Sequence, residues 1–300
     1  MIHPSPDRPA DGAELSDLAA RARSIRRSCL ESIAALGVGH VGGSMSVVET
    51  LAILYFRHLR LDPSDPKNPD RDRFVLSKGH AGPALYAALA EKGYIPRELL
   101  FTLNKGGTSL PSHADRRKTP GVDMSTGSLG QGFSAACGIA LGLRMDGLRA
   151  DGSIRRCWTI IGDGESDEGQ VWEAAAFAAH YRLDNLIAFT DANRFQIDGA
   201  TEAVMHLRDL SAKWSAFGWR TFRVDGHDLA ALDRTILSAC SPDPEADAKS
   251  RGRPSMIILD TVKGKGVPSL EGRAESHNAP FGPADLKAAL DAMDKEAPRG

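Results

Sequence analysis

A carboxylate and a side-chain amide stand thirty residues apart in the stretch from Cys157 to Gly199. Asp163 lies in a Gly-Asp-Gly turn, and Asn193 ends an Asp-Ala-Asn sequence. One charged and one neutral oxygen together suit a hard divalent cation such as Mg²⁺, which keeps open coordination positions for phosphate oxygens. The glycines of the turn, Gly162 and Gly164, would let a ligand come close to the backbone.

The elements around these two residues read as a βαβ unit. Asp163 and Asn193 each follow a short apolar run, and an Ala-rich segment long enough for three helical turns lies between the runs. In an open parallel sheet, ligands bind beyond the carboxyl ends of the strands. We therefore expect Asp163 and Asn193 to be neighbours, with the helix that begins near Gly169 directing free N–H groups at an anion.

Two histidines and a second glycine-rich segment lie in comparable positions. His80 directly follows a predicted strand at 74–77, where an α/β sheet binds ligands. His40 lies in a glycine-dense loop at 37–44, which would allow close approach to a ligand. The segment 125–132 opens an apolar helix and could hold a phosphate or a cofactor ring.

The whole pattern predicts an α/β fold with an open, mostly parallel sheet and helices on both faces. Residues 1–12 read as a flexible tail, and 13–300 as a single domain. Outside the βαβ unit, the predicted strands are 74–77, 220–224 and 255–261, and the predicted helices are 13–36, 46–57, 83–92, 132–145, 203–217, 229–239 and 284–292. The segment 263–267 is expected to be mobile, and 241–252 is a charged excursion.

Composition limits the kinds of molecule that the chain is expected to bind and the compartment in which we expect it. The formal net charge is −2, so no basic field would attract nucleic acid or an anionic membrane. The apolar segment 132–145 is too short to span a bilayer, and its Gly138 and Gly142 suggest close packing on neighbours. Four scattered cysteines without a Cys-x-x-Cys pair indicate reduced thiols in a cytoplasmic protein.

The stretch from Cys157 to Gly199 resembles the thiamine diphosphate (ThDP) motif, in which Gly-Asp-Gly is followed about thirty residues later by Asn. Its particular residues, which include Glu168-Gly169 and Trp172-Glu173-Ala174, resemble those of the transketolase family. Further motifs occur in family order from the first helix to His277. They are Gly39-His40, Ser77-Lys78-Gly79-His80, His113, the segment 125–132 and Lys263-Gly264-Lys265-Gly266.

The resemblance implies a role for each matching residue. Asp163, Asn193 and the backbone carbonyl of Phe195 would bind Mg²⁺, or another divalent cation such as Ca²⁺ or Mn²⁺. Gly162 and Gly164 would lie against the diphosphate. The thiazolium ring and its approach would lie near Gly127, Leu129 and Gly130, and the substrate channel would be lined by His40, His80, His113 and His277. We expect His58, His180 and His206, on predicted helices, to be structural, and His3 and His227 carry no motif.

Three departures from the family pattern stand out near these histidines. Val41 replaces a usual Pro after His40, and Ser112 and Ala114 flank His113 where Gly and Pro are usual. Loss of Pro loosens a loop, so the orientations of His40 and His113 are less fixed by sequence than that of His80.

The family also uses a Glu from a second, pyrimidine-binding domain to deprotonate the cofactor. The chain stops at Gly300 without such a domain and therefore resembles the N-terminal subunit of a split transketolase. The resemblance implies a separate partner chain, the C-terminal subunit, in a heterotetramer. Glu168 would then join a carboxylate pairing across the interface between the two chains.

The expected activity is transfer of a two-carbon ketol unit from a ketose or ketose phosphate to an aldose. One alternative is the ThDP-binding subunit of a 2-oxo acid dehydrogenase, which would need neither Ser77-Lys78-Gly79-His80 nor four channel histidines. Another is a non-catalytic scaffold or regulatory subunit that keeps the fold, against which the intact Asp163 and Asn193 count. The sequence does not name the donor or the acceptor.

Overall fold

Five parallel strands form the central sheet of the computed structural model, which describes residues 6–246 and 252–296. Across the sheet the strands follow the order β2 (Arg73–Leu76), β3 (Cys157–Gly162), β4 (Leu186–Ala192), β6 (Ser255–Asp260) and β5 (Arg220–Asp225). Because all five run in the same direction, their carboxyl ends meet at one edge of the sheet. Residues 1–5 of the predicted tail 1–12, with His3, and residues 247–251 of the charged excursion lie outside the described residues.

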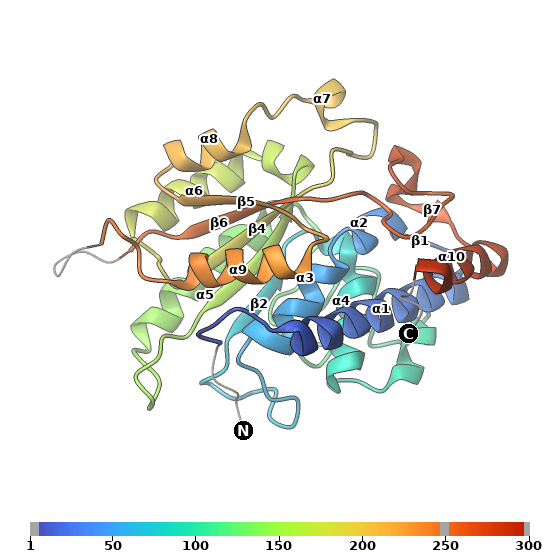
Figure 1. Cartoon of the computed structure of the whole chain (residues 1–300), viewed down its shortest axis with the longest axis horizontal. Helices are drawn as coiled ribbons and strands as arrows, with labels where there is room; N and C mark the ends of the chain where they lie inside the picture. The colour runs from blue at the N-terminus through green and yellow to red at the C-terminus, as the bar shows by residue number, and fades with distance from the viewer. Residues whose placement is uncertain (1–5, 247–251, 297–300) are drawn as a thin grey trace.

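Helices cover both faces of this sheet, as expected (Figure 1). Successive strand residues point to opposite faces, so Ile160 packs into one apolar cluster and Ile161 into the other. The first cluster includes residues of α1 (Gly12–Leu36), α3 (Val48–Ile53), α4 (Gly82–Lys92), α9 (Leu229–Cys240) and α10 (Pro283–Glu296). The second includes residues of α5 (Gln131–Met145), α6 (Gly169–His180) and α8 (Leu210–Ala216).

Local capping defines the first helix. Asp11 accepts backbone N–H groups at the start of α1, and Glu14 closes a capping box. Gly37 ends the helix in the left-handed region, with φ of +89°. Just before the helix, the N–H of Ala10 donates to Asp233 at 2.6 Å, so this end of the chain is attached to α9.

The glycine-dense loop was predicted wrongly. Val41–Met45 form a short buried helix, α2, after the two-residue strand β1 (Val38–Gly39). The reason is close packing, because a Cβ at Gly43 would lie 2.7 Å from the ring of His80. The predicted helix 46–57 is α3 followed by a π-helical turn, Leu54–His58.

Two other expectations also differ from the structure. The predicted helix 203–217 is broken into α7 (Thr201–Val204) and α8, because Asp209 caps a new helix by accepting the N–H of Ala212. In α5, Gly138 and Gly142 are exposed, and a Cβ at either would meet no atom within 4 Å. These glycines therefore do not serve close packing within this chain.

The segment 263–267, expected to be mobile, is packed against the body of the chain. Lys263 and Val267 are buried, and the N–H of Gly264 donates to the carbonyl of Gly42 at 3.0 Å. His277 ends a 3-10 turn, Ala274–His277, and is followed by strand β7 (Ala279–Pro280), which pairs antiparallel with β1. A segment that follows the first helix and one that precedes the last helix therefore pair beside the central sheet.

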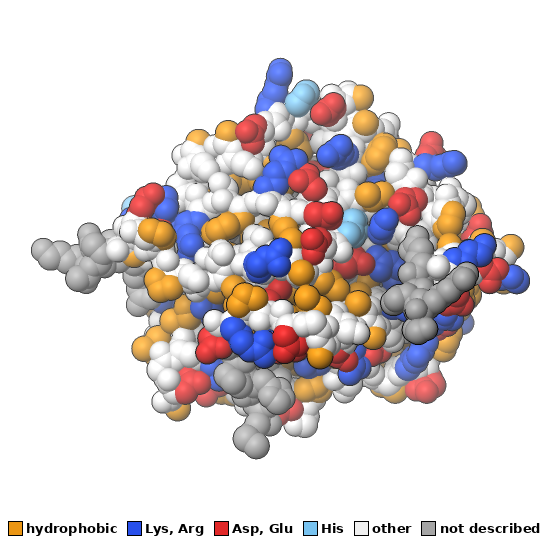
Figure 2. All heavy atoms as spheres, viewed as in Figure 1, with side chains coloured by type: hydrophobic (Ala, Val, Ile, Leu, Met, Phe, Trp, Pro, Cys, Tyr) orange, Lys and Arg blue, Asp and Glu red, His pale blue; other side chains and the backbone are white. Residues whose placement is uncertain are grey.

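Acidic and basic side chains are interspersed over the face drawn in Figure 2, so this face carries no extended field of one sign. Among the described residues, the helices are all too short or too polar to cross a lipid bilayer.

Candidate active site

A cavity of about 370 Å³ opens beyond the carboxyl ends of the central strands. Most of the predicted site residues line it, namely His40, His80, His113, His277, Gly127, Leu129, Gly162, Asp163, Gly164, Asn193 and Phe195. Gly130 and Glu168 do not line it. The fold thus brings loops from six separate parts of the chain to one place, at the sheet edge where parallel sheets bind ligands.

The register of β3 and β4 places the two central motifs side by side. Gly162 pairs with Asp191, and the N–H of Asp163 donates to the carbonyl of Asp191 at 3.1 Å. The carboxylate of Asp163 accepts the N–H of Arg194 at 2.7 Å and that of Gly164 at 2.8 Å. The loops after the two strands therefore adjoin, as the βαβ reading requires.

Asp163 and Asn193 fit a divalent cation. Asp163 is buried, and among the described residues it forms no ion pair; burial and the charge of Asp191 raise its pKa to about 6. The amide nitrogen of Asn193 donates to Asp191 at 2.8 Å, which fixes the orientation of its oxygen. A buried carboxylate that lacks a cation, next to an oriented amide oxygen, is a suitable pair of ligands for Mg²⁺.

The backbone carbonyl of Phe195 already faces a positive charge. The ammonium of Lys263 donates to this carbonyl at 3.3 Å and to the carbonyl of Gln196 at 3.0 Å. Burial and the nearby Lys78 lower the pKa of Lys263 to about 8. Sequence reasoning assigned no role to this lysine, although its Lys-Gly-Lys-Gly motif matches the family.

A buried ion pair holds the loop that carries Asn193. The ammonium of Lys78 pairs with Asp191, and both side chains are fully buried. Asp191 also accepts hydrogen bonds from Ser46 and Thr261, in addition to the one from Asn193. Sequence reasoning missed this network, because its members come from four distant segments.

Glu165 is a second residue that sequence reasoning missed. Its buried carboxylate accepts the hydroxyl of Ser77, the N–H of Gly130 at 2.9 Å and the N–H of Gly162 at 3.1 Å. It therefore joins the loops after β2 and β3 to the start of α5. Burial raises the pKa of this carboxyl group, against the effect of its hydrogen bonds.

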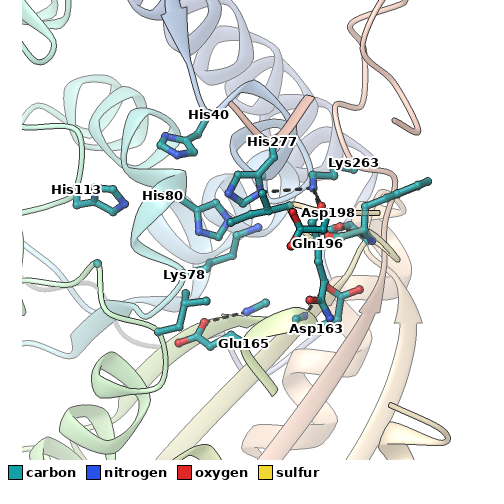
Figure 3. A pocket seen from close by; sticks show the side chains of 18 residues that line it. His40, Lys78, His80, His113, Asp163, Glu165, Gln196, Asp198, Lys263 and His277 are labelled. Atoms are coloured by element: carbon teal, nitrogen blue, oxygen red, sulfur yellow. Dashed lines mark hydrogen bonds between the residues drawn. The ribbon is translucent and has the colours of Figure 1, made fainter. Parts of the chain in front are cut away.

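Four histidines from separate segments gather on one side of the cavity, while Asp163 and Glu165 lie at the other (Figure 3). The ring of His40 lies 5.8 Å from that of His80, 5.6 Å from His113 and 5.4 Å from His277, measured between centroids. The rings of His80 and His277 are 4.9 Å apart. The cluster forms although Val41 and Ala114 replace the usual prolines.

These histidines are neutral at pH 7. Burial, followed by the charge of His113, lowers the pKa of His40 to about 4. Burial and Lys263 lower that of His277 to about 4 as well, and burial with Lys78 holds the pKa of His80 well below its usual value. A neutral imidazole can accept a proton or donate its N–H, which suits it to hydroxyl-bearing substrates.

We expect the free energy of unfolding to fall as the pH drops from about 6.5 to about 4. The unfolded chain binds protons at His40 and His277 from about pH 6.5, whereas the folded chain binds them only near pH 4. The unfolded state therefore holds more protons in this window and gains stability there. Urea unfolding measured across this range should show a shallower pH dependence in the double variant H40N/H277N, and an unchanged slope would contradict the assignment.

The variant Gly43→Ala should be less stable by about 1–3 kcal/mol, because overpacking at a buried position forces neighbours to move. A Cβ there would lie 2.7 Å from the His80 ring. The matched control is Gly138→Ala on the open side of α5, which should stabilise the helix by about 0.5–1 kcal/mol. Urea unfolding of both variants measures the loss of stability expected for Gly43→Ala and the gain expected for Gly138→Ala. A G43A chain as stable as the wild type would show that the contact is loose.

The remaining predicted residues lie outside the cavity. Glu168 is exposed and occupies the N-cap position of α6 without making a side-chain cap. His58 is buried and bonds to Asp233 at 2.8 Å, and His227 bonds to Glu49 at 3.0 Å, so both act in the packing of helices. Among the described residues, no three His, Cys, Asp or Glu side chains are grouped where they could hold a metal ion; the predicted metal ligands are instead a carboxylate, an amide and a backbone carbonyl.

Comparison with known proteins gives a family match over most of the chain. Residues 18–297 match the family described as transketolase, thiamine diphosphate binding domain. The chain is 55% identical over 280 residues to the 6-deoxy-6-sulfo-D-fructose transketolase subunit of Clostridium sp. (strain MSTE9), covering 93% of this chain and 97% of that protein. It is 38% identical to an apulose-4-phosphate transketolase subunit of Actinobacillus succinogenes, with the same coverage of both chains.

Solved structures show the same architecture. A transketolase from Leishmania mexicana superposes with a TM-score of 0.84 at 28% identity, and a transketolase variant from Pichia stipitis with a TM-score of 0.84 at 31% identity. These comparisons cover 98% and 93% of this chain, but only 42% and 41% of the chains of the solved proteins. The chain thus spans less than half the length of these enzymes.

Proposed function

The chain belongs to the transketolase family, in which it matches the ThDP-binding domain, and we propose that it is one subunit of a two-chain transketolase. In this proposal it transfers a two-carbon ketol unit from a ketose, or a ketose phosphate, to an aldose. The observation that carries the proposal is the single cavity in which Asp163 and Asn193 face four neutral histidines.

Residues at the sheet edge would hold the cofactor. Asp163, Asn193 and the Phe195 carbonyl would bind a divalent cation, and Gly162 and Gly164 would leave room for the diphosphate. When bound, ThDP supplies a thiazolium carbon that attacks a ketose carbonyl and stabilises the negative charge left on bond cleavage. Gly127 and Leu129, which line the same cavity, would form the wall beside the thiazolium ring.

The histidines would handle protons and hydroxyl groups. His40 lies within ring-contact distance of the other three, so a substrate chain that enters here meets several imidazoles together. Neutral imidazoles would stabilise the oxyanion formed on attack and accept the hydroxyl proton lost on cleavage. A 2-oxo acid substrate would offer no row of hydroxyl groups to such a cluster, which favours the transketolase reading.

A partner chain would complete the site. Two relatives that match nearly end to end are named as transketolase subunits, which supports a second chain here. We propose that this partner is the C-terminal subunit, that it supplies the pyrimidine-binding domain with its Glu, and that exposed Glu168 faces it in a heterotetramer. Substrates would be sugar phosphates or similar polar sugars, such as those in the relatives' names.

We also propose a cytoplasmic location. All four cysteines lie within the described residues and are free thiols, three of them buried. A reducing compartment suits such thiols.

Activity of the purified chain tests the whole proposal. With ThDP and Mg²⁺, the chain alone should turn over ketose donors at least about 1,000-fold more slowly than the chain mixed with its C-terminal partner, since the deprotonating Glu would be missing. Coupled assays with a panel of ketoses, aldoses and 2-oxo acids measure this. Full activity without a partner would refute the two-chain proposal, and activity on 2-oxo acids alone would favour the dehydrogenase alternative.

A further inference from the structure

A second cleft, lined by six basic side chains, lies apart from the catalytic cavity. Its volume is about 680 Å³, within the range of pockets that hold small molecules. The walls come from residues 66–73, which lead into β2, from the loop 116–124, and from Ala135 and Ile139 of α5. Because Arg73 begins β2 and the catalytic cavity lies beyond its other end, the two sites are on opposite ends of this strand.

The acidic residue in the cleft is already neutralised. Both carboxylate oxygens of Asp123 bond to the guanidinium of Arg71, and one also accepts the N–H of Phe74 at 2.8 Å. Nearby Asp115 accepts the N–H of Arg117 and the hydroxyl of Ser125. Asp123 is thus paired with Arg71, whereas Asp115 keeps its charge; the N–H of Arg117, the hydroxyl of Ser125 and then the charges of Arg117 and Lys118 lower its pKa.

The side chains that line the cleft nevertheless carry more positive than negative charge. Arg116, Arg117 and Lys118 follow one another in an exposed turn, and Lys67 lies on the opposite wall. Within residues 6–246 and 252–296, no Asp or Glu forms an ion pair with any of these four. The chain as a whole carries 37 Lys and Arg against 39 Asp and Glu, so this excess is local.

Arg73 supplies a cation deeper in the cleft. Its side chain is half-buried, one nitrogen donates to the carbonyl of Arg71 at 2.7 Å, and its Nε lies 3.9 Å from Asp123, beyond hydrogen-bond distance. Burial and the neighbouring Arg71 lower its pKa. The guanidinium thus shares Asp123 with Arg71 at a longer distance, and the planar fork of its remaining N–H groups suits an oxyanion.

We propose that this cleft binds a small molecule that carries at least two phosphate groups. One group would bond to Arg73 inside the cleft, and the other would lie among Arg116, Arg117 and Lys118 at the rim. The proposal goes beyond the transketolase function and does not depend on it, because none of these residues lines the catalytic cavity.

The cleft is nevertheless linked to the catalytic cavity through the chain. The basic turn 116–118 lies near the start of the loop 114–126, and the residues on either side of this loop, His113 and Gly127, both line the cavity. The N–H of Thr126 donates to the carbonyl of Ala114 at 3.1 Å, which closes the loop at its base. A ligand in the cleft would therefore bind to the loop that carries these two cavity residues.

Calorimetry with tripolyphosphate as the probe tests the proposal. The full chain is titrated in buffer with EDTA, which removes the metal-dependent site from the measurement, at two salt concentrations. The variant R116Q/R117Q/K118Q should bind at least about tenfold more weakly, and Arg73→Gln at least about threefold, because each loses charge-assisted hydrogen bonds. The matched control R234Q/K287Q/K295Q removes the same charge from exposed positions elsewhere and should bind as the wild type does.

Three results would overturn the proposal. Equal weakening by the control triple variant would mean non-specific attraction and overturn the proposal. So would an absence of tripolyphosphate binding, or binding of an acidic peptide such as polyglutamate in its place, which would make the cleft a protein-docking surface. Circular dichroism of every variant confirms that it is folded. ThDP binding in the presence of Mg²⁺ is measured separately. A failure of the cleft proposal can then be told apart from a failure of the proposed function.

Discussion

The variant Asp163→Asn is expected to lose Mg²⁺-dependent ThDP binding by more than about 100-fold, because the charged ligand that holds the cation is gone. The substitution keeps the shape of the side chain, and an amide oxygen can still accept the N–H of Arg194, which lies 2.7 Å from the carboxylate. The variant should also remain folded, since the metal-free carboxylate is buried without an ion-pair partner among the described residues.

Calorimetric titration with ThDP, with and without Mg²⁺, measures this loss. Glu173→Gln on the exposed side of α6 is the control for charge and should leave the affinity unchanged. If D163N bound the cofactor as tightly as the wild type, the metal site would have to lie elsewhere, and the reading of the Gly-Asp-Gly turn would fail.

The variant Lys78→Met should destabilise the chain by about 3–5 kcal/mol, because it leaves Asp191 buried without its cation. Both side chains are fully buried. Although burial raises the pKa of Asp191, the charge and hydrogen bond of Lys78 outweigh that effect and keep the pKa below its usual value. Since Asp191 also holds the amide of Asn193, the variant should weaken metal-dependent ThDP binding as well.

Urea unfolding of a double-mutant cycle separates charge from packing. K78M/D191N should be more stable than K78M alone, since the second change removes the unpaired charge. Lys105→Met, at an exposed position, should change the stability by less than about 0.5 kcal/mol. Strictly additive losses in the cycle would mean that the two groups do not interact, contrary to the contact in the structure.

Residues close in sequence allowed most of the fold to be predicted. Apolar runs gave the strands around Asp163 and Asn193, and helical periodicity gave α1, which begins at Gly12 rather than 13. Two of the errors, at α2 and at the segment 263–267, fell where tertiary contact outweighs local composition. The glycines of α2 indicated a loop, but they are small because His80 and Ser276 press against them.

The parts of the site that the sequence did not reveal are contacts between distant segments. Sequence alone showed Glu165 as one of several acids in a turn, and only the fold shows that it joins the loops after β2 and β3 to the start of α5. Lys78 stood inside a recognised motif, yet its partner Asp191 is more than a hundred residues away. Periodicity carries no information about which side chains from separate strands will meet.

The pairing of β1 with β7 has a consequence for how the site is assembled. Gly39, next to His40, lies opposite Ala279, two residues after His277, so one wall of the cavity joins segments more than two hundred residues apart in the sequence. Contacts of such sequence separation close late in folding. The central sheet can be complete while this wall is still open. Proteolytic removal of the residues after Thr261 should therefore leave a chain that keeps much of its secondary structure but has lost one side of its binding chamber.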